Sequence, residues 1–156
     1  MVYDKASTND TEQLTELRIK FLLEDYGEIP EDTLAAIKDK LPAYFREHLN
    51  KDMFVFVCRD NGIIISCVFL YVSEKPSNPS FVNGKTGTVM NVYTEPMYRR
   101  KGIAGELIRM MLSESAEMQL DFVELQATED GYSLYTSAGF EDVVSKYHNM
   151  KYIIEK

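Results

Sequence analysis

Hydrophobic residues in the first fifty positions recur at helical spacing in two segments. Two helices are therefore predicted, one over residues 11–25 and one from Pro30 to Leu49, with a short strand over 3–7 before them. Pro42 is expected to bend or split the second helix. The apolar positions that define the two helix faces are Leu14, Leu17, Ile19, Phe21 and Leu22, then Leu34, Ile37, Leu41, Tyr44, Phe45 and Leu49.

The pair Asn61-Gly62 separates two β-rich runs and predicts a tight antiparallel hairpin. Its strands are expected over 53–58 and 63–72. With a loop of only these two residues, Cys58 and Cys67 would share a face but lie diagonally, which is poor disulfide geometry. We interpret both cysteines as reduced, packed thiols.

The second half of the chain alternates between strand and helix patterns. Strands are predicted over 87–94 and 122–127, and they are followed by helices over 103–118 and 131–137. Alternating apolar residues after Gly139 favour two further strands. The predicted order is therefore β-α-α-β-β-β-α-β-α-β-β, which defines an α/β (α+β) fold with a mixed, mostly antiparallel sheet flanked by helices. The first two helices should cover one face of this sheet and the helix after residue 102 the other.

The composition agrees with one soluble domain over residues 1–156. Hydrophobic residues make up 45% and charged residues 27% of the chain, which is typical of a globular protein. No stretch approaches the roughly 20 apolar residues that span a bilayer, so no membrane partner is expected. The polar start, Met1 to Asp10, does not resemble a signal peptide, and a cytoplasmic location is the default expectation.

The charge balance restricts the class of partner. With a net charge of −8, no nucleic-acid partner is expected, because phosphate binding needs a basic face. An acidic surface would attract a cationic acceptor such as an amine, although solubility alone also accounts for it. With two histidines and no close Cys/His cluster, no metal site is expected.

The most informative segment is a β-branched strand that runs through a proline turn into a basic glycine loop and then a helix. The loop contains Arg99, Arg100 and Lys101, followed by Gly102 and Gly105. Glycines let the backbone approach an anion closely, and the free N–H groups and dipole of a helix start favour negative charge. These features predict a pyrophosphate-binding site.

Two common nucleotide motifs do not fit. The segment Gly102-Ile103-Ala104-Gly105 lacks the G-x-G-x-x-G spacing of a dinucleotide-binding loop. Gly84-Lys85-Thr86 looks like the end of a P-loop, but Pro79 stands where the first glycine is needed, and a strand rather than a helix follows. A nucleotide hydrolase is therefore rejected.

Two motifs together resemble those of the Gcn5-related N-acetyltransferase (GNAT) superfamily. Arg99-x-x-Gly102-x-Ala104 matches its [Q/R]-x-x-G-x-[G/A] motif, after the fourth strand and at the start of the third helix. The segment 134–140, Leu-Tyr-Thr-Ser-Ala-Gly-Phe, resembles its L-Y-x-x-x-G-F motif. The order of elements agrees with a single-domain GNAT-like fold over essentially the whole chain.

The resemblance implies an N-acyltransferase that moves an acetyl group from acetyl-CoA, its co-substrate, to an amine by direct attack. The pyrophosphate would lie on the glycine loop, and the pantetheine arm would enter a splay between the fourth and fifth strands. A bulge near Asn91-Val92-Tyr93 would open that splay, and a backbone N–H near Val92 would polarise the thioester carbonyl. The implied cofactor-binding residues are Val92, Tyr93, Thr94, Arg99, Arg100, Lys101, Gly102, Ile103, Ala104 and Gly105.

The same resemblance assigns Tyr135 as the general acid that protonates the departing thiolate. The general base is not obvious, because the predicted strand 87–94 lacks the carboxylate that many relatives have there. Glu124 or Glu129 are candidates, with Asp130, His148 or a water chain as further alternatives. Many relatives also have an asparagine where this chain has a threonine, at position 128, which removes a side-chain amide contact to the cofactor.

Acceptor recognition is expected in the least generic segments, the link between the first two helices and the loop over 74–86. Tyr26 and Glu28, with the neighbouring carboxylates, would bind a cation, although a solvated turn is an equally good interpretation. A small-molecule or peptide amine is the expected partner, and a homodimer through the final strands is known in similar proteins. The alternative to an enzyme is a non-catalytic CoA-binding or regulatory module with the same fold.

Overall fold

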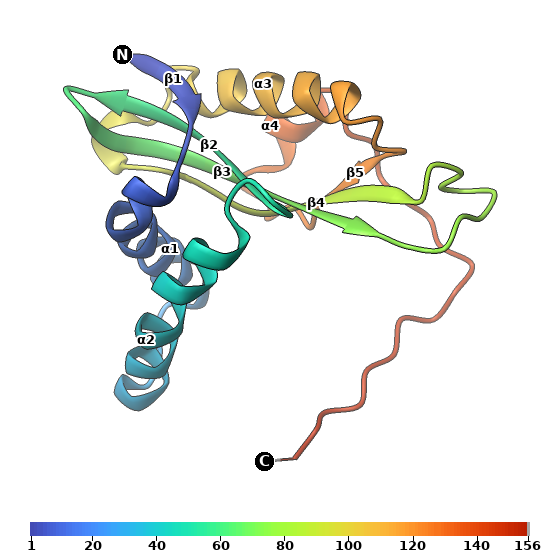
Figure 1. Cartoon of the computed structure of the whole chain (residues 1–156), viewed down its shortest axis with the longest axis horizontal. Helices are drawn as coiled ribbons and strands as arrows, with labels where there is room; N and C mark the ends of the chain where they lie inside the picture. Colours follow the sequence, from blue (N-terminus) through green and yellow to red (C-terminus); the bar gives the residue numbers. More distant parts are fainter. Residues whose placement is uncertain (156) are drawn as a thin grey trace. The chain divides into compact units, whose positions relative to one another are not determined.

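The computed structural model describes residues 1–155 and contains a five-stranded sheet with strand order β1-β2-β3-β4-β5 (Figure 1). Neighbouring strands are antiparallel from β1 to β4, and β5 joins β4 in parallel. The mixed, mostly antiparallel sheet predicted from the sequence is thus confirmed. The strands are β1 (Val2–Lys5), β2 (Met53–Asp60), β3 (Ile63–Glu74), β4 (Lys85–Thr94) and β5 (Val123–Glu124).

Helices cover both faces of this sheet, with α1 and α2 on one face and α3 on the other (Figure 1). The turn before α1 is a capping box, in which Ser7 and Asp10 satisfy each other's backbone N–H groups. Gly27 ends α1 with a φ of 78°. Pro42 lies inside α2 without splitting it. The helices are η1 (Thr8–Asp10), α1 (Thr11–Tyr26), α2 (Glu31–His48), η2 (Pro96–Tyr98), α3 (Ile103–Glu117) and α4 (Tyr132–Ser137).

The β2–β3 hairpin turns through Asn61 and Gly62, whose φ angles of 50° and 81° are those of the expected tight loop. A register shift between Cys58 and Arg59 corrects the predicted pairing. A two-residue loop without this shift would place Phe56 opposite Cys67. In the structure Val57 lies there, so the two cysteines lie on opposite faces of the sheet instead of sharing one. Both thiols are free and buried, as predicted.

Strand β4 carries a bulge at Met90. Its neighbours Val89 and Asn91 pair with the consecutive residues Leu70 and Phe69 of β3, which leaves Met90 without a partner. The bulge lies directly before the segment where the sequence placed it. Because a bulge bends its strand, it locally changes the direction of the β4 backbone.

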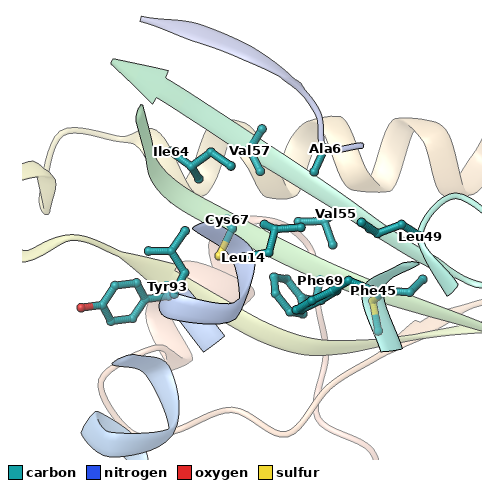
Figure 2. Packing of buried hydrophobic residues seen from close by; sticks show 12 residues of the cluster. Ala6, Leu14, Phe45, Leu49, Val55, Val57, Ile64, Cys67, Phe69 and Tyr93 are labelled. Atoms are coloured by element: carbon teal, nitrogen blue, oxygen red, sulfur yellow. The ribbon is translucent and has the colours of Figure 1, made fainter. Parts of the chain in front are cut away.

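An apolar core lies between the sheet and the helices α1 and α2 (Figure 2). Leu14 and Phe45 supply the helix side and are 0% and 1% exposed. Burying such side chains contributes about 2–3 kcal/mol each relative to leaving them in water. This core fixes α1 against the middle strands. The sheet side of the cluster includes Val55, Val57, Cys67, Phe69 and Tyr93.

The chain divides into two compact units, Met1–Gln126 and Ala127–Lys156. The second unit contains α4, and its segment 139–155 forms no strand, in contrast to the two strands predicted there. Val144 is 97% exposed and Met150 is 90% exposed. An alternating apolar pattern forms a strand only where a neighbouring strand takes its backbone hydrogen bonds, and none does so within the described residues.

No helix within residues 1–155 is both long enough and apolar enough to cross a lipid bilayer.

Candidate active site

The glycine loop leads from the end of β4 to the start of α3, as the sequence indicated. After η2 the chain is extended at Arg99, adopts a φ of 61° at Arg100 and a φ of 80° at Gly102, and then enters α3 at Ile103. A Cβ atom added at Gly102 would meet nothing within 4 Å. Glycine is therefore needed there for its left-handed backbone and open surface, not because the surrounding protein is crowded.

The loop leaves its backbone donors unpaired. Within residues 1–155, no backbone N–H from Arg100 through Gly105 donates to a protein acceptor, and the first such bond of α3 runs from Glu106 to the carbonyl of Gly102 at 3.1 Å. No side chain caps this helix start. A row of free donors at the positive end of a fifteen-residue helix is a site for an anion such as a phosphate.

The basic side chains of the loop have different surroundings. Arg99 is bound away from the loop, because its Nη2 meets Glu24 Oε2 at 2.6 Å and its Nε donates to the Thr94 carbonyl at 2.8 Å. Its guanidinium also lies over the Tyr93 ring. Arg100 and Lys101 are exposed at the loop itself. The structure thus gives Arg99 a positioning contact with α1 and leaves the next two cations at the anion site.

Strand β4 presents a free edge beside this loop. Only Gly87 and Thr88 pair with β5, so the remainder of β4, over 89–94, has β3 on one side and no paired strand on the other within the described residues. Val92 is half-buried, and Tyr93 is buried with its pKa raised, first by burial. An extended chain with amide groups can pair with such an edge. The fourth and fifth strands thus pair only at these two positions and separate beyond Thr88.

Tyr135 lies on α4 in the second unit and is half-buried. Its ring meets Phe140 edge-on at 5.9 Å, and the N–H of Phe140 donates to its carbonyl at 3.0 Å. Gly139 turns the chain between them with a φ of 105°. Burial raises the pKa of the Tyr135 phenol above its ordinary value of 10.0, so the hydroxyl is protonated at neutral pH.

The candidate bases are all on the surface. Glu124 is exposed on β5, opposite Thr88 of β4. Glu129 and Asp130 are exposed in the turn before α4, where the Thr128 hydroxyl accepts from the Gly131 N–H at 3.2 Å. This contact closes the turn, and Gly131 is the residue directly before α4.

The predicted acceptor residues lie at the end of α1 and just beyond it. Tyr26 is 70% exposed, and Glu28 is exposed as well. Of the carboxylates near Tyr26, Glu24 is already paired with Arg99. The cation site that the sequence suggested there therefore has one carboxylate fewer than expected.

Sequence reasoning missed Arg18, which lies on α1 and reaches the bulge of β4. Its Nη1 donates to the Met90 carbonyl at 3.1 Å and to Asn91 Oδ1 at 3.2 Å. Asn91 is only 2% exposed. A cation on a helix is ordinarily solvated, and nothing in the local pattern marks this one. The contact joins residues more than seventy positions apart.

Comparison with known proteins agrees with this geometry. Residues 51–142, more than half of the chain, match the family described as Acetyltransferase (GNAT) domain. The chain therefore belongs to the GNAT acetyltransferase family, and the predicted enzyme class is confirmed at that level. No sequence among the curated proteins matches the chain significantly.

Solved structures support the same assignment. A predicted acetyltransferase from Clostridium acetobutylicum, determined with acetyl-CoA, is 26% identical, with 96% of this chain and 95% of that chain covered and a TM-score of 0.82. A GCN5-related N-acetyltransferase from Ralstonia eutropha JMP134 is also 26% identical, with 96% and 97% covered and a TM-score of 0.80. A ribosomal-protein-alanine N-acetyltransferase from Brucella melitensis shares the fold at 19% identity, with 97% and 100% covered and a TM-score of 0.68.

Proposed function

We propose that this protein transfers the acetyl group of acetyl-CoA to an amine by direct attack. The observation that carries the proposal is the row of unpaired N–H groups from Arg100 to Gly105 at the start of α3. These donors, with Arg100 and Lys101 beside them, suit the pyrophosphate of coenzyme A. The similar Clostridium protein, whose structure was determined with acetyl-CoA, supports the same donor.

The free edge of β4 would take the pantetheine arm. Its amide groups would pair with the backbone over 89–94 in the manner of an added strand. This arrangement carries the thioester towards Val92, where a backbone N–H would polarise the carbonyl. Tyr93 and Thr94 complete the strand that faces the arm.

The transfer step needs no covalent enzyme intermediate. The lone pair of the acceptor nitrogen attacks the thioester carbonyl carbon, a C–N bond forms and the C–S bond breaks. The proton lost from nitrogen passes to a base, for which Glu124 and Glu129 are the alternatives. The departing thiolate takes a proton from Tyr135, whose raised pKa keeps the phenol protonated until it is needed.

Calorimetric titration with acetyl-CoA tests the donor assignment. Gly102→Glu should weaken binding on the order of 100-fold, because like charges a few ångströms apart repel strongly in a partly dry site. Gly62→Glu is the matched control, since Gly62 has the same left-handed backbone, with a φ of 81°, and equally open surroundings. Equal affinity of Gly102→Glu and the control would show that the loop does not hold the cofactor.

Release of CoA thiol in the presence of an amine panel tests the transfer. Tyr135→Phe should lower kcat about 100-fold with little change in acetyl-CoA affinity, which is the range for loss of a general acid. Acetyl-CoA binding without turnover of any amine would favour the non-catalytic module. The absence of a carboxylate from β4, where a general base would be expected, is the observation that favours a non-catalytic module as the second candidate.

A further inference from the structure

Arg18 is held in an unusual place for a charged side chain. It is half-buried between α1 and the sheet, with its guanidinium over the Phe21 ring. Both of its hydrogen bonds are made by Nη1, to Met90 and Asn91 at the β4 bulge. Burial lowers the pKa of Arg18, which shows that the surroundings disfavour the charge.

No carboxylate neutralises this charge by direct contact. Within the described chain, Arg18 forms no ion pair at 4.0 Å or less, and Asp25 acts on it only at longer range. A cation taken out of water normally has an anion beside it, because its desolvation is otherwise uncompensated. An anion from outside the chain would supply the missing partner.

The hydrogen-bonding geometry points the same way. Nε and Nη2 of Arg18 donate to no acceptor among residues 1–155, so one edge of the guanidinium keeps its N–H groups available. This edge has the fork geometry that binds the two oxygens of a carboxylate. Meanwhile Asn91 fixes the other end, because its Oδ1 accepts from Arg18 and its Nδ2 points at Cys67 Sγ, 3.7 Å away.

The position of Arg18 relative to the reacting thioester indicates which molecule would carry the anion. Met90 and Asn91 directly precede Val92, where the proposed mechanism places the thioester carbonyl. Arg18 lies on the α1 face of the sheet, whereas the anion-binding start of α3 belongs to the helix on the opposite face (Figure 1). The donor's pyrophosphate is thus accounted for elsewhere, and an anion at Arg18 would belong to the molecule that approaches from the α1 face.

We propose that Arg18 binds a carboxylate of the acceptor, so that the substrate class is an amine that also carries a carboxylate, as amino acids do. This inference rests on the proposed acetyl transfer and adds the acceptor to it. A structural role at the bulge would use only Nη1 and would leave the Nε–Nη2 edge to solvent. An amino-acid-like acceptor uses that edge and restores charge balance around the half-buried guanidinium.

The test compares matched acceptors that differ only in this charge. The α-amino acids, β-alanine, 4-aminobutanoate and 6-aminohexanoate are each paired with the corresponding carboxamide, and CoA release from acetyl-CoA is measured. The wild type should prefer the acids. Arg18→Gln should lower kcat/KM for the preferred acid about 30-fold, the range for hydrogen bonds to charged groups, and leave its carboxamide nearly unchanged.

Two further variants and two further measurements separate a carboxylate-binding role of Arg18 from a structural one. Arg18→Lys should recover part of the preference as a point charge, and Arg46→Gln, which removes an exposed arginine of α2, should change nothing. Circular dichroism melting shows that each variant is folded. Acetyl-CoA affinity by calorimetry should change less than kcat/KM for the acid, because Arg18 contacts β4 at Met90 and Asn91 but makes no hydrogen bond to the glycine loop proposed to hold the pyrophosphate.

The inference is overturned by a preference for carboxamides, by equal losses with acid and amide in Arg18→Gln, or by no turnover of any acid while acetyl-CoA still binds. It is also overturned if malonyl-CoA or succinyl-CoA with a neutral amine shows the Arg18-dependent preference instead, since the carboxylate would then belong to the acyl chain. If the wild type does not bind acetyl-CoA, this result would contradict the proposed function itself.

Discussion

Two half-buried arginines of this protein differ in whether the surrounding chain provides carboxylate partners for them. Arg59, near the end of β2, has its Nη1 and Nη2 each 2.8 Å from a carboxylate oxygen of Asp10, and its Nε 3.1 Å from Asp4. Arg18, on α1, reaches only a carbonyl and an amide oxygen. One guanidinium is fully provided with anions by the fold, and the other has none in contact.

The difference separates a structural charge from one that is available for a ligand. Asp10 also accepts from the Ser7 N–H in the capping box, so the Arg59 pair ties β1, η1 and β2 into one unit. A bidentate pair of this kind is complete without any further molecule. At Arg18 the described chain supplies no anion in contact, and the proposed acceptor site rests on this observation.

Replacing the paired arginine should have the largest effect on stability. Arg59→Met leaves the Asp10 carboxylate, with a side chain only 10% exposed, without its cation, and we expect a loss of about 3 kcal/mol in the free energy of unfolding. Urea unfolding measures this loss. Acetyl-CoA affinity should stay at the wild-type value, and a loss below about 1 kcal/mol would contradict the contrast drawn between the two arginines.

The second-largest effect on stability is expected from acid, which should weaken the pair between Arg59 and Asp10. Hydrogen bonds from Arg59 hold the pKa of Asp10 below its ordinary value of 3.8, so the pair stabilises the fold above that pH and loses this contribution as the pH falls below it. Asp10→Asn should cost about 2 kcal/mol at pH 7 and progressively less than that below pH 3.8. A difference between wild type and variant that did not change with pH would argue against this ion pair.

The smallest stability effect is expected at the unpaired arginine. Arg18→Met removes two hydrogen bonds but also removes a desolvated charge, and these changes nearly offset each other, for a net cost of about 1 kcal/mol. The same urea experiment compares it with Arg59→Met. A cost as large as that of Arg59→Met would mean that Arg18 is chiefly a support for the β4 bulge.

Much of the fold could be predicted because its signals are local. Leu14 and Leu17 mark one helix face, Asn61-Gly62 fixes a hairpin, and the segment from Arg99 to Gly105 combines turn chemistry with a helix start. Each of these features is decided within a few residues. The GNAT fold was expected from the resemblance of Arg99-x-x-Gly102-x-Ala104 and of the segment 134–140 to the family's motifs, and the order of the elements agrees with it.

The errors arose where a distant partner decides the outcome. The register shift beside Cys58 cannot be read from the hairpin sequence, and the strands expected around Val144 and Tyr152 need a neighbouring strand that they do not have in the described structure. Arg18 was missed for the same reason, because its role depends on a bulge far along the chain. Local patterns predict elements, whereas contacts between elements create the site.

The two cysteines on opposite faces of the sheet have a practical consequence for labelling chemistry. Burial raises the pKa of Cys67 to about 12 and also raises that of Cys58. Disulfide exchange requires the thiolate, which for Cys67 is on the order of 10⁻⁵ of the thiol at pH 7. A chromogenic disulfide reagent will therefore react at once with released coenzyme A, and with the protein's own thiols only as fast as the sheet opens. One reagent thus measures both the rate of acetyl transfer and the rate of local unfolding.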